Sequence, residues 1–269
     1  MAVVPFPDPQ SQRERPHWSD VDDRDAGGKM SFLEHLDEFR RRLINSLIAI
    51  AVGIAVGFFF IDRVLQFIMV PLQRMLPAGN HFIYTEPTEA FLLYVKTAFL
   101  AGLIIAAPAI ASQIWLFVAP GLYANEKKFA LPFIFFMTLG FVGGAAFSHY
   151  IVFPLMWRYL GSFDSDFLAF TPRIAPAFSL YTRMMLATAV IFQMPTLVFA
   201  LARMGVITAR WMLRQFKYAV LINFVVAAVI TPGGDPMSQL LLGGPMCALY
   251  LISIVIAWAF GKRRAPAEV

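Results

Sequence analysis

Six apolar segments, most of them near 20 residues long, determine the fold class of this chain. An apolar helix of about 20 residues crosses the hydrocarbon core of a lipid bilayer. The chain is 59% hydrophobic and only 14% charged, whereas an average soluble domain has about 25% charged residues. The sequence therefore predicts an all-α polytopic membrane protein with six transmembrane helices. The predicted spans cover residues 43–61, 92–118, 129–152, 178–201, 217–231 and 238–259.

The two ends of the chain are polar and differ from the apolar part. Residues 1–30 contain four prolines and a run of mixed charge, which is typical of a disordered tail rather than of a signal peptide. We therefore expect a cytoplasmic tail over 1–30, one membrane domain over 31–260 and a second cytoplasmic tail over 261–269. The last two spans are predicted to be short. Prolines scattered through the helices are expected to bend them into a curved, concave bundle.

Lysine and arginine are distributed unequally over the two sides of this predicted bundle. Sixteen of the 22 basic residues lie in the N-terminal segment, in the 119–128 and 202–217 loops and in the C-terminal tail. Because loops rich in basic residues stay in the cytoplasm, both termini are predicted to be cytoplasmic. The same distribution explains the net charge of +5 without a nucleic acid partner. Acidic residues in the N-terminal tail argue against an organelle transit peptide, so a bacterial inner membrane is expected.

Charged residues are concentrated at 31–43, immediately before the first apolar segment. Ser31 and Glu34 form a capping-box pattern, and the apolar residues of the stretch share one helical face. An amphipathic helix at the membrane surface, running into the first span, is therefore expected. Its acids can be explained as solvated partners of nearby arginines. Alternatively, Glu38 and Glu126 are carboxylates on a surface that is otherwise positive, and could bind a cationic peptide through bidentate arginine contacts.

Four polar side chains fall inside the apolar segments: Gln113, His149, Gln193 and Asn223. Such groups usually face the interior of a helix bundle and are candidates for function. Gln193 precedes Pro195 by two residues, so its amide could instead satisfy a backbone carbonyl that the proline leaves free. His149 is close to an outer helix end and is expected to be an interfacial side chain.

Sequence patterns of common catalytic and cofactor sites are absent. There is no GxxxxGK[ST] phosphate-binding loop, no HExxH metal motif and no GxSxG nucleophile elbow. The four histidines are too dispersed for a metal site, and one cysteine cannot form an internal disulfide. We therefore expect no catalytic residue, no metal and no cofactor. Nothing in the pattern supports an intramembrane hydrolase using Ser148 or Ser253.

Two motifs on the predicted cytoplasmic side resemble those of the TatC family, the multispanning receptor subunit of the twin-arginine protein translocase. FLEHLDEFRRRL (32–43) is similar to the family's amphipathic leading motif, with Glu38 and Arg40 in its acid–x–Arg positions. SQIWLFVAPGLYANEKK (112–128) is similar to the end of the second span and the first cytoplasmic loop, including Phe117 and Glu126.

Two further motifs on the outer side complete the resemblance. VPL (70–72) places Pro71 at the family's outer-loop proline, and TPGGDPMSQ, followed by GPM, is similar to the turn before the last span. The four motifs occur in the family's order and cover about 30–260. Two positions depart from the family: Gln193 and Leu251 stand where members often carry a glutamate. An amide cannot shuttle protons as an acid, although it can still form hydrogen bonds.

The resemblance implies a receptor for signal peptides that carry two consecutive arginines on folded cargo proteins. Glu38 and Glu126 would each accept one guanidinium, and Arg40 would orient the acids. The implied partners are TatB-type and TatA-type single-span subunits, other TatC copies and the lipid bilayer, and the proton-motive force would supply the energy. No enzymatic step is implied. Further implied site residues are Phe117 for the signal peptide, and Pro71, Gln193, Thr231, Asp235 and Gln239 for functional loops or partner contacts.

A second class of function stays open on the sequence alone. In a secondary transporter of small molecules or ions, Lys96, Gln113 and Gln193 would line a substrate path through the bundle. Flux of a solute into liposomes without partner proteins would favour this class.

Overall fold

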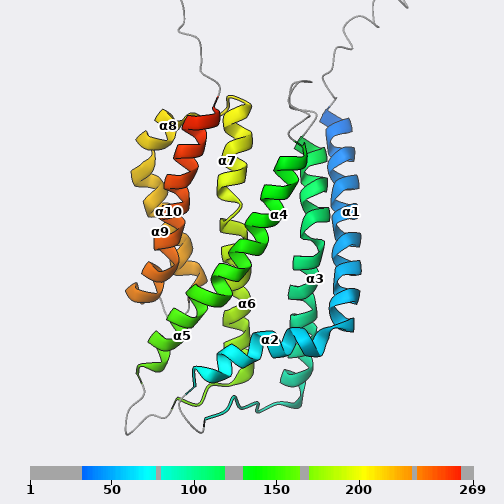
Figure 1. Ribbon diagram of the computed structural model, residues 1–269, viewed down its shortest axis with the longest axis vertical. Helices are drawn as coiled ribbons and strands as arrows, with labels where there is room; N and C mark the ends of the chain where they lie inside the picture. Colours follow the sequence, from blue (N-terminus) through cyan, green and yellow to red (C-terminus); the bar gives the residue numbers. More distant parts are fainter. Residues whose placement is uncertain (1–31, 77–79, 119–129, 164–169, 232–234, 262–269) are drawn as a thin grey trace, which may run out of the picture. The chain divides into compact units, whose positions relative to one another are not determined.

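The computed structural model describes residues 32–76, 80–118, 130–163, 170–231 and 235–261. In this part of the chain the fold is all-helical, and the only extended pairing is an isolated parallel bridge between Ile83 and Arg173. Figure 1 shows the arrangement of the helices. In chain order they are α1 (Phe32–Phe59), α2 (Ile61–Arg74), α3 (Pro87–Val118), α4 (Ala130–Phe147), the π-helix η4 (Ser148–Val152), α5 (Phe153–Gly161), α6 (Ile174–Ile191), α7 (Met194–Arg203), α8 (Ala209–Arg214), α9 (Phe216–Ile230) and α10 (Pro236–Phe260).

Five helical stretches of the described chain are long and apolar enough to cross a membrane. The remaining predicted span, the fifth (217–231), corresponds to α9, which has 15 residues and is about 22 Å long, shorter than the hydrocarbon core of about 30 Å. Helix α10 has 25 residues, so of the last two helices only α9 is short, which corrects the expectation for α10. The all-α membrane fold is confirmed, whereas the six crossings and the orientation of the termini stay predictions. The five stretches are Leu33–Phe59, Pro87–Val118, Ala130–Gly161, Ile174–Arg203 and Pro236–Phe260.

Contacts divide the chain into two units, Met1–Arg41 and Arg42–Val269. The described part of the first unit is the beginning of α1, where Leu36 and Phe39 are about half exposed. Helix α1 is continuous across the predicted amphipathic stretch and the first span, as expected, although Ser31 of the capping box lies outside the described residues. The features described below belong to the second unit unless stated otherwise.

Glycines bring α1 and α3 into close contact. A Cβ atom built on Gly53 would lie only 2.4 Å from the carbonyl oxygen of Gly102. One turn later, a Cβ on Gly57 would lie 3.0 Å from the carbonyl oxygen of Ala98. Backbones in a membrane approach this closely where side chains are absent, which is the principle of the GxxxG motif. Gly53 and Gly57 therefore form the surface of α1 that packs on α3.

The predicted fourth span consists of two helices. Helix α6 ends at Ile191 and α7 begins at Met194, with Pro195 in the first turn of α7. Proline has no N–H and its ring clashes with the carbonyl oxygen four residues earlier, so an uninterrupted helix is unfavourable here. Gln193 lies at this break, between the two helices.

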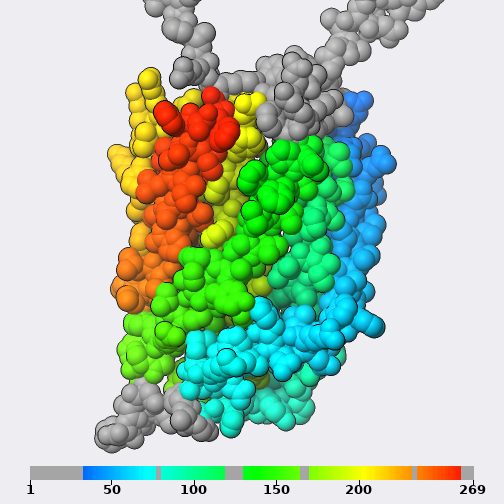
Figure 2. Space-filling view, viewed as in Figure 1, coloured from blue at the N-terminus to red at the C-terminus, as the bar shows by residue number. Residues whose placement is uncertain are grey.

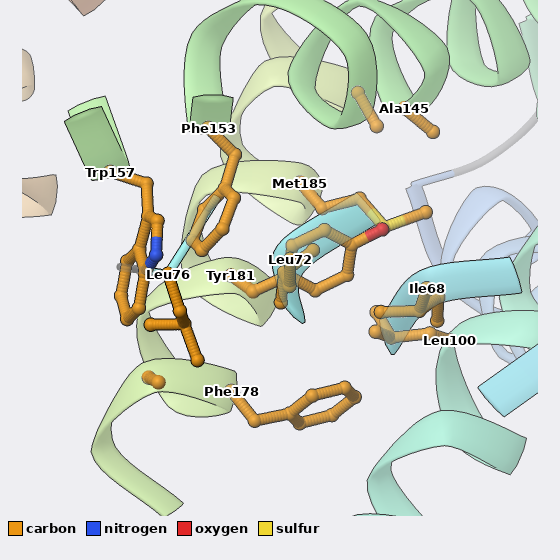
Figure 3. Close-up of a cluster of buried hydrophobic side chains, with 12 residues drawn as sticks. Ile68, Leu72, Leu76, Leu100, Ala145, Phe153, Trp157, Phe178, Tyr181 and Met185 are labelled. Carbon is orange, nitrogen blue, oxygen red and sulfur yellow. The ribbon is translucent and has the colours of Figure 1, made fainter. Parts of the chain in front are cut away.

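The predicted third span continues beyond residue 152, because α4, η4 and α5 form one helical stretch that ends at Gly161. It leads into an aromatic cluster shown in Figure 3. Phe153 stacks on Trp157 with the ring centroids 5.4 Å apart, and Tyr181 of α6 meets Phe153 edge-on at 5.2 Å. Ile68 and Leu72 of α2 are buried in the same cluster. Helices α2 and α5, which fall in the predicted outer loops, are thereby fixed to α6.

Candidate functional site

The predicted peptide-binding carboxylates are only partly within the described residues. In α1, Glu38 is partly buried and Arg40 is exposed. Glu126 lies outside the described residues, so its pairing with Glu38 stays a prediction. Glu38 belongs to the first unit of the chain, and its placement is described by its position in α1 alone.

Phe117, in the last turn of α3, is partly buried. Gln113 precedes it by one turn on the same helical face. The amide oxygen of Gln113 accepts long hydrogen bonds of 3.4 Å from both Arg42 Nη1 and Asn45 Nδ2 of α1. This intramembrane glutamine therefore links α1 to the end of α3 that carries Phe117.

An apolar groove of about 310 Å³ opens between α4, α7 and α10. We refer to it as the α4–α10 groove, and Figure 2 shows the face on which α4 and α10 flank it. The end of α3, the end of α7 and the end of α10 lie at the same end of the second unit, the upper end in Figure 1. A segment of apolar side chains is the chemistry that such a groove accommodates. Its lining is Pro132, Phe133, Phe136, Pro195, Thr196, Phe199, Ile256 and Phe260.

Gln193 is buried at the break between α6 and α7, with 8% of its surface exposed. Its Nε2 donates to the carbonyl oxygen of Ala189 at 3.3 Å, because the backbone N–H of Gln193 bonds to Val190 instead. The amide thus satisfies a freed carbonyl at the break, two residues before the carbonyl of Ile191 that Pro195 alone would leave free. Its Oε1 is buried and has no hydrogen-bond partner among the described residues, so one acceptor stays open for a partner.

The end of α9 and the beginning of α10 carry three of the predicted site residues, Thr231, Asp235 and Gln239. The hydroxyl of Thr231, which is buried, donates to the carbonyl oxygen of Ala227 at 2.9 Å. Asp235 caps α10, and its Oδ2 accepts from the backbone N–H of Ser238 at 2.8 Å. This hydrogen bond is the main reason why the pKa of Asp235 lies below its ordinary value. Gln239 is partly buried in the first turn of α10.

Pro71 is located inside α2 and is partly buried. It is next to Leu72, which belongs to the aromatic cluster of Figure 3. The predicted outer-loop proline is therefore part of an ordered helix. Its role in function stays a prediction.

Two polar contacts were not foreseen from the sequence. His149 is 3% exposed, stacks on Phe67 at 4.7 Å and shares a hydrogen bond of 3.0 Å with the hydroxyl of Tyr181, so the expectation of an interfacial histidine is wrong. Glu89 is buried and forms an ion pair with Arg173. For His149 the available signal was a polar residue within an apolar segment, whereas Glu89 and Arg173 lie just outside the predicted spans. In both cases the partners lie too far apart along the chain to be identified by spacing.

Comparison with known proteins identifies the family. The family model described as "Sec-independent protein translocase protein (TatC)" matches residues 34–245. The chain belongs to the TatC family. The TatC of Koribacter versatilis is 41% identical over 233 residues, which is 85% of each chain. The TatC of Helicobacter pylori strain J99 is 41% identical over 223 residues, covering 83% of this chain and 87% of the relative.

Solved TatC structures share this fold. A crystal structure of the twin-arginine translocase receptor TatC has a TM-score of 0.74 and 34% identity, covering 83% of this chain and 98% of the other. A second crystal structure of the same receptor, in the detergent DDM, has a TM-score of 0.73 and 33% identity. The resemblance drawn from the four motifs is confirmed: the chain is a Sec-independent protein translocase of the TatC family, an integral membrane protein of a transport system.

Proposed function

We propose that this chain is the core receptor of twin-arginine translocation in a bacterial inner membrane. It binds signal peptides with two consecutive arginines, on folded precursor proteins, at the cytoplasmic face. The observation that carries this proposal is the similarity to a solved TatC described as a twin-arginine translocase receptor, at 34% identity over 83% of this chain.

The chemistry of the site rests on two carboxylates. Glu38 and Glu126 would each accept one guanidinium of the arginine pair, since the planar guanidinium fork matches the two oxygens of a carboxylate. Arg40, two residues after Glu38, would orient the acids. A lysine pair in the peptide would bind more weakly, because an ammonium cannot form the bidentate contact.

The apolar part of the signal peptide requires a separate surface. The α4–α10 groove offers one, with aromatic and aliphatic walls at the same end of the second unit as the end of α3. Burial of each leucine-sized side chain in such a groove contributes about 1.5–3 kcal/mol before the costs of association. Phe117, in the last turn of α3, would add an apolar contact for the signal peptide.

Binding is a recognition step, so the energy of transport would come from the proton-motive force and the pore from partner subunits. TatB-type and TatA-type single-span proteins would dock on α9 and α10, and other copies of this chain would join the complex. The 15 residues of α9 would thin the bilayer beside it. Gln193, Thr231, Asp235 and Gln239 are the proposed polar contacts for these partners, with Pro71 in the outer loop.

The test is site-specific crosslinking of a twin-arginine peptide to the chain in membranes. Glu38→Ala and Glu126→Ala should each reduce crosslinking about tenfold or more, the factor expected for one hydrogen-bonded charge pair. Asp37→Ala is the matched control, because Asp37 is an exposed acid of the same helix on another face, and it should have no effect. Unchanged crosslinking in both glutamate variants would refute the site.

The transporter alternative finds no support in the geometry. Lys96 and Gln113 are 17 residues apart in α3, which places them about 25 Å apart along the helix axis. Lys96 donates to Ser179, whereas Gln113 accepts from Arg42. The side chains therefore belong to separate contacts in the described part of the chain. Flux of a small solute into liposomes that contain this chain alone would reinstate that function.

A further inference from the structure

A small polar cavity lies where α3 and α6 begin, at the lower end of the second unit in Figure 1. Its volume is about 190 Å³, and we refer to it as the α3–α6 cavity. None of its residues takes part in the proposed peptide site or partner contacts. The lining includes Glu86, Glu89, Lys96, Arg173, Leu92 and Phe178.

The carboxylate of Glu89 has one satisfied and one unsatisfied oxygen. Its Oε1 accepts from Arg173 and, at 3.4 Å, from the hydroxyl of Thr85. Its Oε2 is buried and has no hydrogen-bond partner among the described residues. A buried carboxylate oxygen without a donor is costly. This oxygen therefore favours a ligand that brings an N–H donor, and above all a cationic one.

Lys96 and Arg173 supply the opposite chemistry to the same cavity. The ammonium of Lys96 has three donor hydrogens, one of which Ser179 accepts at 3.0 Å. The guanidinium of Arg173 has five donors and its side chain is 44% exposed. Both cations can therefore bind an anionic oxygen, such as that of a phosphate, in the cavity that Glu89 also lines.

Exposed apolar side chains lie beside the cavity, near the end of a long helix. Helix α3 has 32 residues and is about 48 Å long, so its ends extend beyond the hydrocarbon core of about 30 Å. In its first turns, Phe91 and Leu92 are 68% and 47% exposed. A ligand in the cavity would therefore be flanked by surface suited to acyl chains.

We propose that the α3–α6 cavity binds the head group of phosphatidylethanolamine. The lipid phosphate contacts Lys96 and Arg173, the primary ammonium donates to Oε2 of Glu89, and the acyl chains cover Phe91 and Leu92. The exposed carboxylate of Glu86 at the cavity wall adds a second negative charge near the ammonium. Phosphatidylcholine lacks N–H donors and cannot satisfy Oε2, and phosphatidylglycerol lacks the positive charge. The inference does not depend on signal peptide binding.

Native mass spectrometry of the delipidated full chain with added lipids tests this directly. Phosphatidylethanolamine should be retained about tenfold more than phosphatidylcholine, the factor for one hydrogen bond to a charged group. Along the N-methylated series between these lipids, retention should decrease, with the last step removing the final N–H. Equal retention of the two lipids, or stronger retention of phosphatidylglycerol, would overturn the proposal. Displacement of the lipid by equimolar soluble glycerophosphoethanolamine would overturn the assignment to a lipid.

Variants separate the two halves of the site. Lys96→Gln should lower the retention of both lipids by a similar factor, because both carry the phosphate. Glu89→Gln should abolish the preference between them. Arg63→Gln is the matched control, since Arg63 is a basic residue of α2 outside the cavity that packs over Phe60, and it should change neither. If Glu89→Gln does not fold, the methylation series on the unmodified chain decides the question alone.

Discussion

The close packing of α1 on α3 leads to a prediction whose magnitude follows from the structure. In Gly53→Ala, the new Cβ would lie 2.4 Å from the carbonyl oxygen of Gly102, about 1 Å inside the ordinary contact range that begins at 3.4 Å. The obstructing atom belongs to the backbone and cannot rotate away, so the two helices must separate. Overpacking of this kind costs about 1–3 kcal/mol, against which the better helix propensity of alanine contributes about 0.5–1 kcal/mol. A net loss of about 0.5–2 kcal/mol is expected.

Gly143→Ala is the matched control for this variant. Gly143 is also a helical glycine, in α4, but a Cβ built on it meets no atom within 4 Å. The propensity gain is common to both variants, so the difference between them isolates the steric cost, about 1–3 kcal/mol. Reversible unfolding of the full chain in mixed micelles of increasing SDS content measures both free energies. If Gly53→Ala is stabilised as much as Gly143→Ala, the contact between α1 and α3 at this position is refuted.

Three further predictions concern polar side chains of the second unit. Asp235→Ala should lose about 1 kcal/mol through the missing N-cap. Because the folded pKa of Asp235 is lowered, the stabilisation by its carboxylate is complete above about pH 4 and is lost as the pH falls through the folded pKa. Thermal unfolding at several pH values measures this loss, and Asp235→Asn should retain the cap but lose the pH dependence. His149→Phe should cost about 1–3 kcal/mol by leaving the buried Tyr181 hydroxyl unpaired, and adding Tyr181→Phe should recover most of it; no recovery in the double variant contradicts the hydrogen bond. Gln193→Leu should unfold within about 1 kcal/mol of the original chain yet transport a twin-arginine precursor more slowly, and an unchanged rate would show that the amide is only structural.

The apolar runs of the sequence predicted most helices within a few residues. The span predicted at 217–231 corresponds to α9, and the span predicted at 238–259 corresponds to α10. These runs are reliable because every backbone polar group in hydrocarbon must bond within its own helix. Helix α2 was not predicted, because Pro71 and its charged residues interrupt the apolar pattern.

The contacts between helices were harder to predict than the helices themselves. Glu89 and Arg173 are 84 residues apart, and no local periodicity connects them. By contrast, Gly53 and Gly57 have the GxxxG spacing, a signal that the sequence carries openly. For the signal-peptide site, four motifs were sufficient to identify the family, but the meeting of Glu38 with Glu126 depends on a loop outside the described residues.

The π-helix at Ser148–Val152 preserves the rotational phase of everything that follows it in the third span. An i→i+5 turn contains one residue more than the i→i+4 turns around it, and each residue of an α-helix corresponds to a rotation of about 100°. The wider turn takes up its extra residue in about the same rotation as an ordinary turn, and this keeps Phe153 and Trp157, which are 0% and 4% exposed, in the cluster that binds α2. Deleting one residue here would restore i→i+4 bonding and leave α5 in the same phase. Inserting one residue into the regular part of α4 would instead rotate α5 by about 100°. The insertion should therefore be far more damaging than the deletion, since it misplaces a whole face of α5 at once.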